Sequence, residues 1–262
     1  SDMIGISKLY FGTVEASDRL RYRKGVHRRP VVVWNCTPAC NLACSHCYAA
    51  CVGEQRVLTT DQARAVIDDL AAFGVPVILF SGGEPFLRPD IRTLAAHAKA
   101  RGIRVTFSTN GTLIDDAWAD WIRDLGVAYV GISIDGTEAI HDAFRRHPGA
   151  YRQSLAAIRR LRDRGVKVGL RVTMTRDNVA SLPAIFDLMR RERVPRICLY
   201  HLVYTGRGRE IAATDLDHAE ARAALNTILA ETRTCFETGF PVEVLTVDNA
   251  CDGIALYLRM KA

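Results

Sequence analysis

Short hydrophobic runs alternate with amphipathic segments along most of this chain. Six runs rich in β-branched and aromatic residues have the length and composition of buried strands. They span 31–35, 77–80, 104–108, 128–134, 167–174 and 197–203. Alternation of such strands with helices is typical of parallel strands joined by right-handed crossovers. The pattern therefore predicts an α/β fold built from six strand–helix units.

Capping residues mark the boundaries of the helices. Thr59 and Gln62 have the spacing of a capping box, and Gly74 follows the end of the same amphipathic segment. Asp115 is placed to cap a second helix, which is expected to end before Gly126. Further helices are predicted at about 152–164, 178–192 and 215–238.

Composition agrees with an enzyme that has a large core. The chain has 262 residues, of which 48% are hydrophobic and 24% charged, and one barrel-like α/β domain of about 250 residues is an ordinary size. No apolar run approaches the ~20 residues that span a bilayer, so no membrane association is expected. The net charge of +6 comes from dispersed arginines, without the aromatic and basic interleaving typical of nucleic-acid binding. Eight cysteines without a signal-peptide pattern favour the reducing cytoplasm.

Three cysteines carry the strongest chemical signal. Cys40, Cys44 and Cys47 are spaced C-x-x-x-C-x-x-C, whereas Fe–S clusters commonly take four cysteines and structural zinc takes four closed ligands. Three thiolates would leave one iron of a four-iron cluster open for chemistry. The alternative is a zinc module that recruits His46 or neighbouring cysteines, but no second cysteine pair follows at zinc-finger spacing. The remaining cysteines are expected to be free thiols: Cys36, Cys51, Cys198, Cys235 and Cys251.

The cysteine motif resembles that of the radical S-adenosylmethionine (SAM) enzymes, which usually carry an aromatic residue at the position of His46. A second motif supports the resemblance, because the strand-like run 77–80 leads into Gly82, Gly83, Glu84 and Pro85. Glycines permit close approach of a ligand, and a carboxylate accepts charge-assisted hydrogen bonds from an ammonium group. The resemblance implies that these four residues lie beside the methionyl part of SAM and hold its amino group.

The resemblance also implies a fold, a partial (β/α)6 barrel, with its ligands at the carboxyl ends of the strands. Cys40, Cys44 and Cys47 would bind one [4Fe-4S] cluster after the first strand. Turn formation is the alternative for the Asn-Gly and Asp-Gly pairs that follow two of the strands. Further SAM contacts are expected from the later strand ends, at Ser108, Asn110, Ser133, Asp135 and Arg171.

Three regions are expected along the chain. Residues 1–30 form an N-terminal extension, 31–240 the partial barrel, and 241–262 the start of a C-terminal segment. Related enzymes continue into a cysteine-rich extension of the SPASM type that holds an auxiliary cluster. We therefore expect this chain to be part of a longer protein, with a second cluster only if such an extension is present there.

Connecting sequence points to a substrate. The segments 3–22, 30–37 and 200–210 resemble the heme-biosynthesis branch of the family, the didecarboxysiroheme deacetylases and the heme d1 enzymes. The resemblance implies reductive cleavage of SAM to a 5′-deoxyadenosyl radical, with reduced ferredoxin or flavodoxin as electron donor. The radical would act on an iron tetrapyrrole, removing acetate side chains of didecarboxysiroheme to give iron coproporphyrin. Arginines that could pair with substrate carboxylates are Arg19, Arg21, Arg23, Arg28, Arg29, Arg207 and Arg209.

Two rival functions remain open at this point. The segment 133–151 is similar to that of radical SAM peptide maturases, which are distinguished by a peptide-recognition domain before the barrel. The residues before the first predicted strand are too few for one, because chains below about 40 residues rarely fold unaided. A zinc or electron-transfer module without enzymatic activity is the other rival. The motifs assign no catalytic residue beyond the cofactor site.

Overall fold

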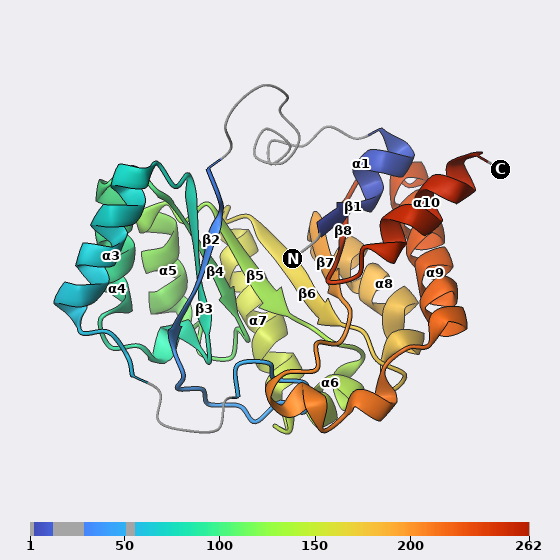
Figure 1. The fold of residues 1–262 in the computed structure, drawn as a ribbon, viewed down its shortest axis with the longest axis horizontal. Helices are drawn as coiled ribbons and strands as arrows, with labels where there is room; N and C mark the ends of the chain where they lie inside the picture. The colour runs from blue at the N-terminus through green and yellow to red at the C-terminus, as the bar shows by residue number, and fades with distance from the viewer. Residues whose placement is uncertain (1–2, 13–28, 51–55, 262) are drawn as a thin grey trace.

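The fold is one curled sheet with helices on its outer side, as Figure 1 shows. The structure is a computed structural model and describes residues 3–12, 29–50 and 56–261. Its sheet has eight strands in the order β1-β8-β7-β6-β5-β4-β3-β2. Strands β2 to β7 are parallel and adjacent in chain order, which confirms the predicted half-barrel. These strands are β2 (Val32–Thr37), β3 (Val77–Gly82), β4 (Arg104–Thr109), β5 (Tyr129–Ser133), β6 (Val168–Thr173) and β7 (Arg196–Tyr200).

Two further strands lie outside the predicted set. Strand β8 (Glu243–Val247) pairs in parallel with β7, and β1 (Met3–Gly5) pairs antiparallel with β8. The sheet therefore takes one strand from within 1–30 and another from within 241–262 and extends past both ends of 31–240. Strand β1 has only three residues and runs directly into α1 (Ile6–Phe11). A hydrophobic run this short is not enough to predict a strand from the sequence.

Helices follow the parallel strands and end where the capping residues predict. The Thr59 side chain accepts from the Gln62 amide, while the Gln62 side chain accepts from the Thr59 amide, and Gly74 ends the helix. Asp115 caps α5 through the Trp118 amide. The helices are α3 (Thr60–Phe73), α4 (Ile91–Ala100), α5 (Asp116–Leu125), α6 (Glu138–Arg145), α7 (Ala150–Asp163), α8 (Leu182–Glu192), α9 (His218–Glu237) and α10 (Cys251–Lys261).

The two sides of the sheet differ in polarity. Between the sheet and its outer helices lies a hydrophobic core that includes fully buried Phe80, Phe107 and Phe186. Inside the curl the strands carry both polar and aliphatic side chains, among them Ser108, Arg171 and Val172. A Cβ atom at Gly131 would collide with the Arg171 side chain. This glycine therefore leaves room for a large polar side chain inside the barrel.

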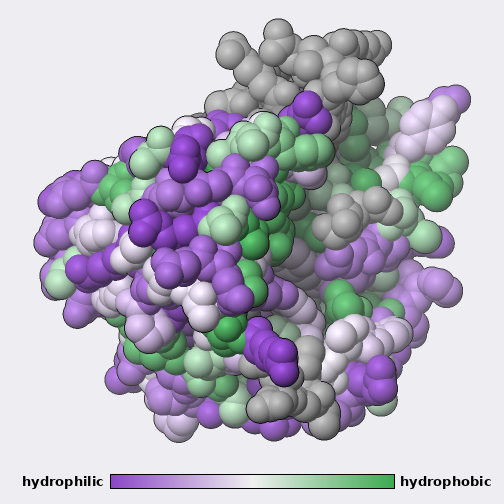
Figure 2. Space-filling model, turned by 60° about the vertical axis from the view of Figure 1, so that its left-hand side comes forward, coloured by the Kyte–Doolittle hydropathy of each residue, from purple (hydrophilic) through white to green (hydrophobic). Residues whose placement is uncertain are grey.

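The surface of the molecule also differs in polarity from one region to another. In Figure 2 hydrophilic residues cover most of the outer face, while hydrophobic residues gather beside a central hollow. In the described ranges, no helix has both the length and the apolar character needed to cross a membrane.

Candidate functional site

A cavity of about 500 Å³ lies at the carboxyl ends of the parallel strands. Its wall includes residues from the ends of strands β4 to β8 and the loop that follows β2. Parallel strands place their carboxyl ends at one edge of the sheet, so groups far apart in the sequence meet there. The cavity is lined by the three motif cysteines Cys40, Cys44 and Cys47, and by Gly82, Gly83, Ser108, Asn110, Ser133 and Arg171 among the predicted SAM contacts.

The two glycines bring the cysteine loop, residues 38–48, against the end of β3. The Gly83 amide donates to the Thr37 carbonyl at 2.7 Å, and a Cβ atom at Gly83 would lie 2.6 Å from the Pro38 carbonyl oxygen. Gly82 has φ +129°, in the region that favours glycine, and its Cβ would collide with the Thr37 carbonyl. The glycine pair is thus required for packing of the loop, in addition to the ligand approach that the sequence suggests.

The three motif cysteines are free thiols in a setting that suits an iron–sulfur cluster. The Leu42 amide donates to Cys40 Sγ at 3.4 Å, and Arg145 Nη1 donates to Cys44 Sγ at 3.5 Å. Such donors stabilise thiolates that ligate metal. No group of three or more His, Cys, Asp or Glu side chains within the described ranges is arranged to hold a single metal ion. Three cysteine thiols on the wall of one cavity are, however, the kind of donor that iron–sulfur clusters take.

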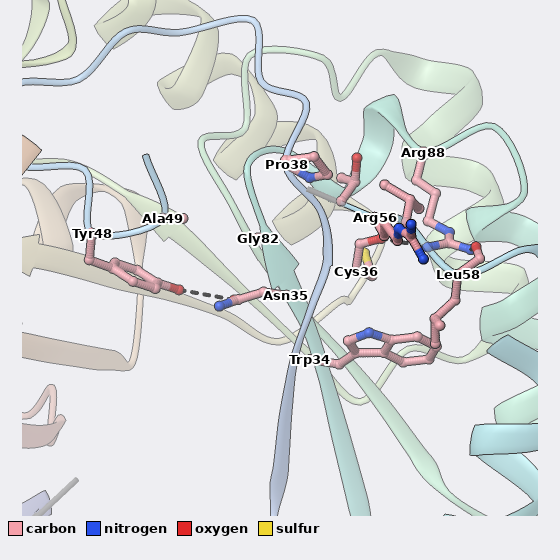
Figure 3. Close-up of a pocket in the computed structure, with 12 residues that line it drawn as sticks. Trp34, Asn35, Cys36, Pro38, Tyr48, Ala49, Arg56, Leu58, Gly82 and Arg88 are labelled. Carbon is pink, nitrogen blue, oxygen red and sulfur yellow. Dashed lines mark hydrogen bonds between the residues drawn. The ribbon is translucent and has the colours of Figure 1, made fainter. Parts of the chain in front are cut away.

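Cys36 lies apart from these thiols. It lines a separate pocket of about 180 Å³ with Trp34 and Arg88 (Figure 3). Its thiol donates to the Ser81 carbonyl at 3.3 Å, and burial raises its pKa to about 12. A protonated, hydrogen-bonded thiol is a poor metal ligand. Cys51, which neighbours the motif in sequence, falls outside the described residues.

Glu84 and Pro85 are buried and do not line the cavity. One Glu84 oxygen accepts from Thr109 Oγ1 at 2.8 Å and from the backbone amide of Phe86 at 3.2 Å. The other accepts from the Asn110 amide at 2.9 Å. Burial raises the pKa of this carboxyl to about 7, although the three donors oppose that shift. Glu84 therefore joins the ends of β3 and β4 here, and its contact with SAM stays a prediction.

Asn110 forms a turn and also lines the cavity, while its contact with SAM stays a prediction. Its side-chain oxygen accepts from the Thr112 amide at 2.8 Å, as in an Asx turn. Its side-chain amide donates to Asn41 at 3.0 Å and faces Cys40 Sγ at 4.0 Å. The turn thus orders a residue that lines the cavity and contacts the cysteine loop.

Asp135 does not line the cavity but positions a residue that does. It is fully buried, and its Oδ2 pairs with Arg145 Nε at 2.7 Å and Nη2 at 2.5 Å. Although burial alone would raise its pKa, Arg145 is the main group that lowers it. Oδ1 accepts from the Thr173 amide at 3.0 Å, which ties the loop after β5 to the end of β6.

Arg145 was not indicated by any motif, since it appears in the sequence only as one of two consecutive arginines.

His46 packs against the residue that precedes Arg145. The Phe144 ring stacks on the His46 ring with centroids 4.3 Å apart. Burial, with Arg145 as the next cause, lowers the pKa of His46 to about 3. The neutral imidazole therefore packs as an aromatic ring would at this position.

Arg171 from β6 and Tyr200 from β7 also line the cavity, and Arg171 Nη1 donates a hydrogen bond to the Tyr200 hydroxyl. Burial opposes the charge of this guanidinium, but the neighbouring Tyr200 and Tyr129 raise its pKa overall. His201, which also lines the cavity, pairs with Asp252 of α10 at 3.0 Å. The His201–Asp252 contact depends on a helix after β8, so spacing within the sequence gave no signal of it.

Three of the arginines proposed for substrate carboxylates are described, and none of these three lines the cavity. Arg207 donates to the Cys44 carbonyl at 2.7 Å. Arg29 packs over the Phe73 ring, and Arg209 is exposed. Arg19, Arg21, Arg23 and Arg28 lie outside the described residues.

The profile of the radical SAM superfamily matches residues 34–189, from the first parallel strand through most of α8. The chain belongs to the radical SAM superfamily. Membership implies a [4Fe-4S] cluster and SAM as cofactors, and the three cysteines on the cavity wall fit that cluster.

Curated relatives place the chain within the superfamily. It is 50% identical to the Fe-coproporphyrin III synthase of Methanosarcina barkeri over 98% of this chain and 68% of that protein. It is 44% identical to the pre-heme d1 synthase of Dinoroseobacter shibae over 86% of this chain and 57% of that protein. It is 40% identical to the AdoMet-dependent heme synthase of Nitratidesulfovibrio vulgaris over 75% of this chain and 54% of that protein. The chain thus spans about half to two thirds of these relatives.

Solved structures share the fold at low sequence identity. Streptococcus suis SuiB bound to its precursor peptide SuiA superposes with a TM-score of 0.70 and 15% identity, over 88% of this chain and 51% of that one. Native anSMEcpe with bound AdoMet superposes with a TM-score of 0.69 and 17% identity, over 82% of this chain and 63% of that one. These likenesses support the radical SAM half-barrel.

Proposed function

We propose that this radical SAM protein acts on an iron tetrapyrrole and removes the acetate side chains of didecarboxysiroheme to give iron coproporphyrin. The observation that carries the proposal is the 50% identity to an Fe-coproporphyrin III synthase across 98% of this chain. A cytoplasmic location and an electron donor of the ferredoxin or flavodoxin type belong to the same proposal.

The cavity supplies the protein's part of this chemistry. Cys40, Cys44 and Cys47 would hold the cluster, which when bound supplies the electron for reductive cleavage of SAM. Ser108 and Ser133 line the wall formed by β4 and β5 and would orient SAM by hydrogen bonding. Arg171 would pair with the SAM carboxylate, because its guanidinium is planar and charged. Aliphatic side chains also line the cavity and would limit the access of water to it.

Anaerobic incubation of the reconstituted protein with SAM, a chemical reductant and didecarboxysiroheme tests the proposal. We expect 5′-deoxyadenosine and iron coproporphyrin, identified by mass spectrometry and absorbance. Formation of 5′-deoxyadenosine without a change in the tetrapyrrole would contradict the substrate and leave the cofactor chemistry standing. Protein with all three motif cysteines replaced by alanine is the control.

A second candidate is a step in heme d1 synthesis, favoured by the 44% identity to a pre-heme d1 synthase. The same incubation separates the two, because the tetrapyrrole products differ in mass. Identity to a peptide maturase, mycofactocin maturase MftC of Mycobacterium tuberculosis, is lower at 33% over 74% of this chain. The peptide reading is therefore the weaker alternative.

A further inference from the structure

A buried cation contacts one of the three motif thiols. The Arg145 side chain is 9% exposed, and its Nη1 lies 3.5 Å from Cys44 Sγ. Its other nitrogens, Nε and Nη2, are occupied by Asp135 at 2.7 and 2.5 Å. One edge of the guanidinium therefore binds a carboxylate while the remaining nitrogen is directed at sulfur.

Asp135 is held in place independently of the cysteine loop. Its Oδ1 accepts from the Thr173 amide at 3.0 Å, and its own amide donates to His141 Nδ1 at 3.1 Å. Burying a guanidinium is costly unless a partner compensates its charge, and Asp135 supplies that compensation. The carboxylate thus fixes both the position and the charge balance of Arg145.

The end of α6 also holds the cysteine loop. The Ser45 amide donates to the Phe144 carbonyl at 3.0 Å, and Ser45 Oγ donates to the same oxygen at 3.1 Å. The stack of His46 on Phe144 lies beside these bonds. The helix end and the loop therefore form one unit, in which the distance between Arg145 and the Cys44 sulfur is set by several contacts.

We propose that Arg145, positioned by Asp135, raises the reduction potential of the family's cluster through a charge-assisted hydrogen bond to Cys44 Sγ. Reduction by an external one-electron donor adds one negative charge to the cluster and its thiolates. A cation close to a ligating sulfur stabilises that added charge, and hydrogen bonds to sulfur are a recognised means of tuning cluster potentials. Asp135 moderates the effect because it neutralises part of the charge.

The test is a redox titration of the reconstituted cluster, followed by electron paramagnetic resonance, without SAM or tetrapyrrole. Arg145→Gln should lower the equilibrium constant for reduction on the order of tenfold, or about 59 mV for a one-electron couple. Arg145→Lys keeps the charge and should recover part of the loss. Asp135→Asn removes the neutralising charge and should shift the potential upward.

Two matched variants separate the sulfur contact from general effects of charge. Arg146→Gln makes the same charge change at the next residue, which is exposed. Arg207→Gln removes a cation that donates to the Cys44 carbonyl oxygen. Both should shift the potential clearly less than Arg145→Gln at equal iron content.

An unchanged potential in Arg145→Gln with full iron content would overturn the proposal. An equal fall of the reduction potential in Arg207→Gln would also overturn it, because any cation near the cysteine loop would then raise the potential as much as Arg145 does. If Arg145→Gln loses its iron, Arg145→Lys and Asp135→Asn decide, and a fall in the potential of Asp135→Asn contradicts the proposed sign. The titration contains no tetrapyrrole, so the proposal for Arg145 can fail while the proposed substrate stands.

Discussion

At the residue scale, neighbours in space decide what a motif residue does. Cys36 lies four residues before Cys40 in the sequence, yet its thiol is buried and donates to the Ser81 carbonyl at 3.3 Å. Glu84 belongs to the SAM motif, yet both of its oxygens accept hydrogen bonds from the protein. For both residues the hydrogen-bond partners show a structural contact that the sequence motif does not indicate.

The thiol environments predict which cysteines bind iron. Replacing Cys40, Cys44 and Cys47 together with alanine should abolish binding of iron and sulfide, because no other described thiol lines the cavity. Cys36→Ala should keep the full iron content, since this thiol lines a separate pocket and donates to the Ser81 carbonyl. Iron and sulfide analysis after anaerobic reconstitution measures both. Equal loss in the triple variant and in Cys36→Ala would show that the ligand assignment is wrong.

Replacing Glu84 should affect stability as well as SAM. Its motif alone predicts that Glu84→Ala weakens SAM binding with the fold intact. The structure predicts a destabilised fold, because three donors lose a buried acceptor and each unsatisfied group costs about 1–3 kcal/mol. The midpoint of thermal unfolding should fall by on the order of 5 °C or more, at about 2–4 °C per kcal/mol for a chain of this size.

Glu84→Gln provides the control for this prediction, because its amide oxygen can still accept from Thr109 and the backbone. It should recover part of the lost stability. An unfolding midpoint unchanged in Glu84→Ala, together with weaker SAM binding by calorimetry, would favour the direct role in SAM binding instead.

At the element scale, α6 links the cysteine loop to the loop after β5. Its last residues hold the cysteine loop and Arg145, while His141, one turn earlier, accepts from the Asp135 amide. The helix ends at Arg145, and the residue that follows, Arg146, adopts φ +52°. This helix of eight residues thus carries contacts to the loops after β2 and β5.

The buried histidine of this helix predicts a pH dependence of stability. Burial lowers the pKa of His141 to about 4, below the 6.5 of an exposed histidine. Between these values the unfolded chain binds a proton that the folded chain does not, so stability falls as the pH decreases from about 6.5 to about 4. The group contributes at most about 1.4 kcal/mol per pH unit over that window.

Thermal unfolding of the reconstituted protein at several pH values measures this dependence. In His141→Gln the loss of stability across the window should be smaller than in the parent protein, even if its midpoint at neutral pH is lower. Parallel pH profiles for the two proteins would assign the effect to other groups.

At the scale of the whole molecule, the half-barrel collects the site. Cysteines after β2, serines on β4 and β5, and Arg171 on β6 line one cavity although they are spread over more than 130 residues. Strands β8 and β1 add Val247 and Met3 to the same wall. Which residues face the cavity therefore depends on the curl of the whole sheet.

If the cavity accepts a tetrapyrrole with several carboxylates, salt should weaken its binding. Exposed charge pairs are screened over about 10 Å at 0.1 M salt, so pairing of carboxylates with arginines predicts lower affinity as salt rises. Anaerobic titration of didecarboxysiroheme, followed by its Soret band at low and high salt, measures this. The fully esterified analogue is the control, and equal affinity for acid and ester would remove the electrostatic part of the proposal.

The sequence by itself determined the features that depend on local spacing. Six strands, the caps of α3 and α5, and the three-cysteine motif were all predictable, because periodicity and capping act over a few residues. The order of those strands follows from the handedness of their crossovers.

Only the tertiary structure decided the partners of the buried charges and the strands at one edge of the sheet. Arg145 meets Cys44 across 101 residues, and β1 meets β8 across most of the chain. The Glu84 and Asp135 carboxylates are buried outside the cavity lining, where they accept hydrogen bonds from backbone amides at neighbouring strand ends. Such contacts arise when strand ends converge, and no spacing within one segment encodes them.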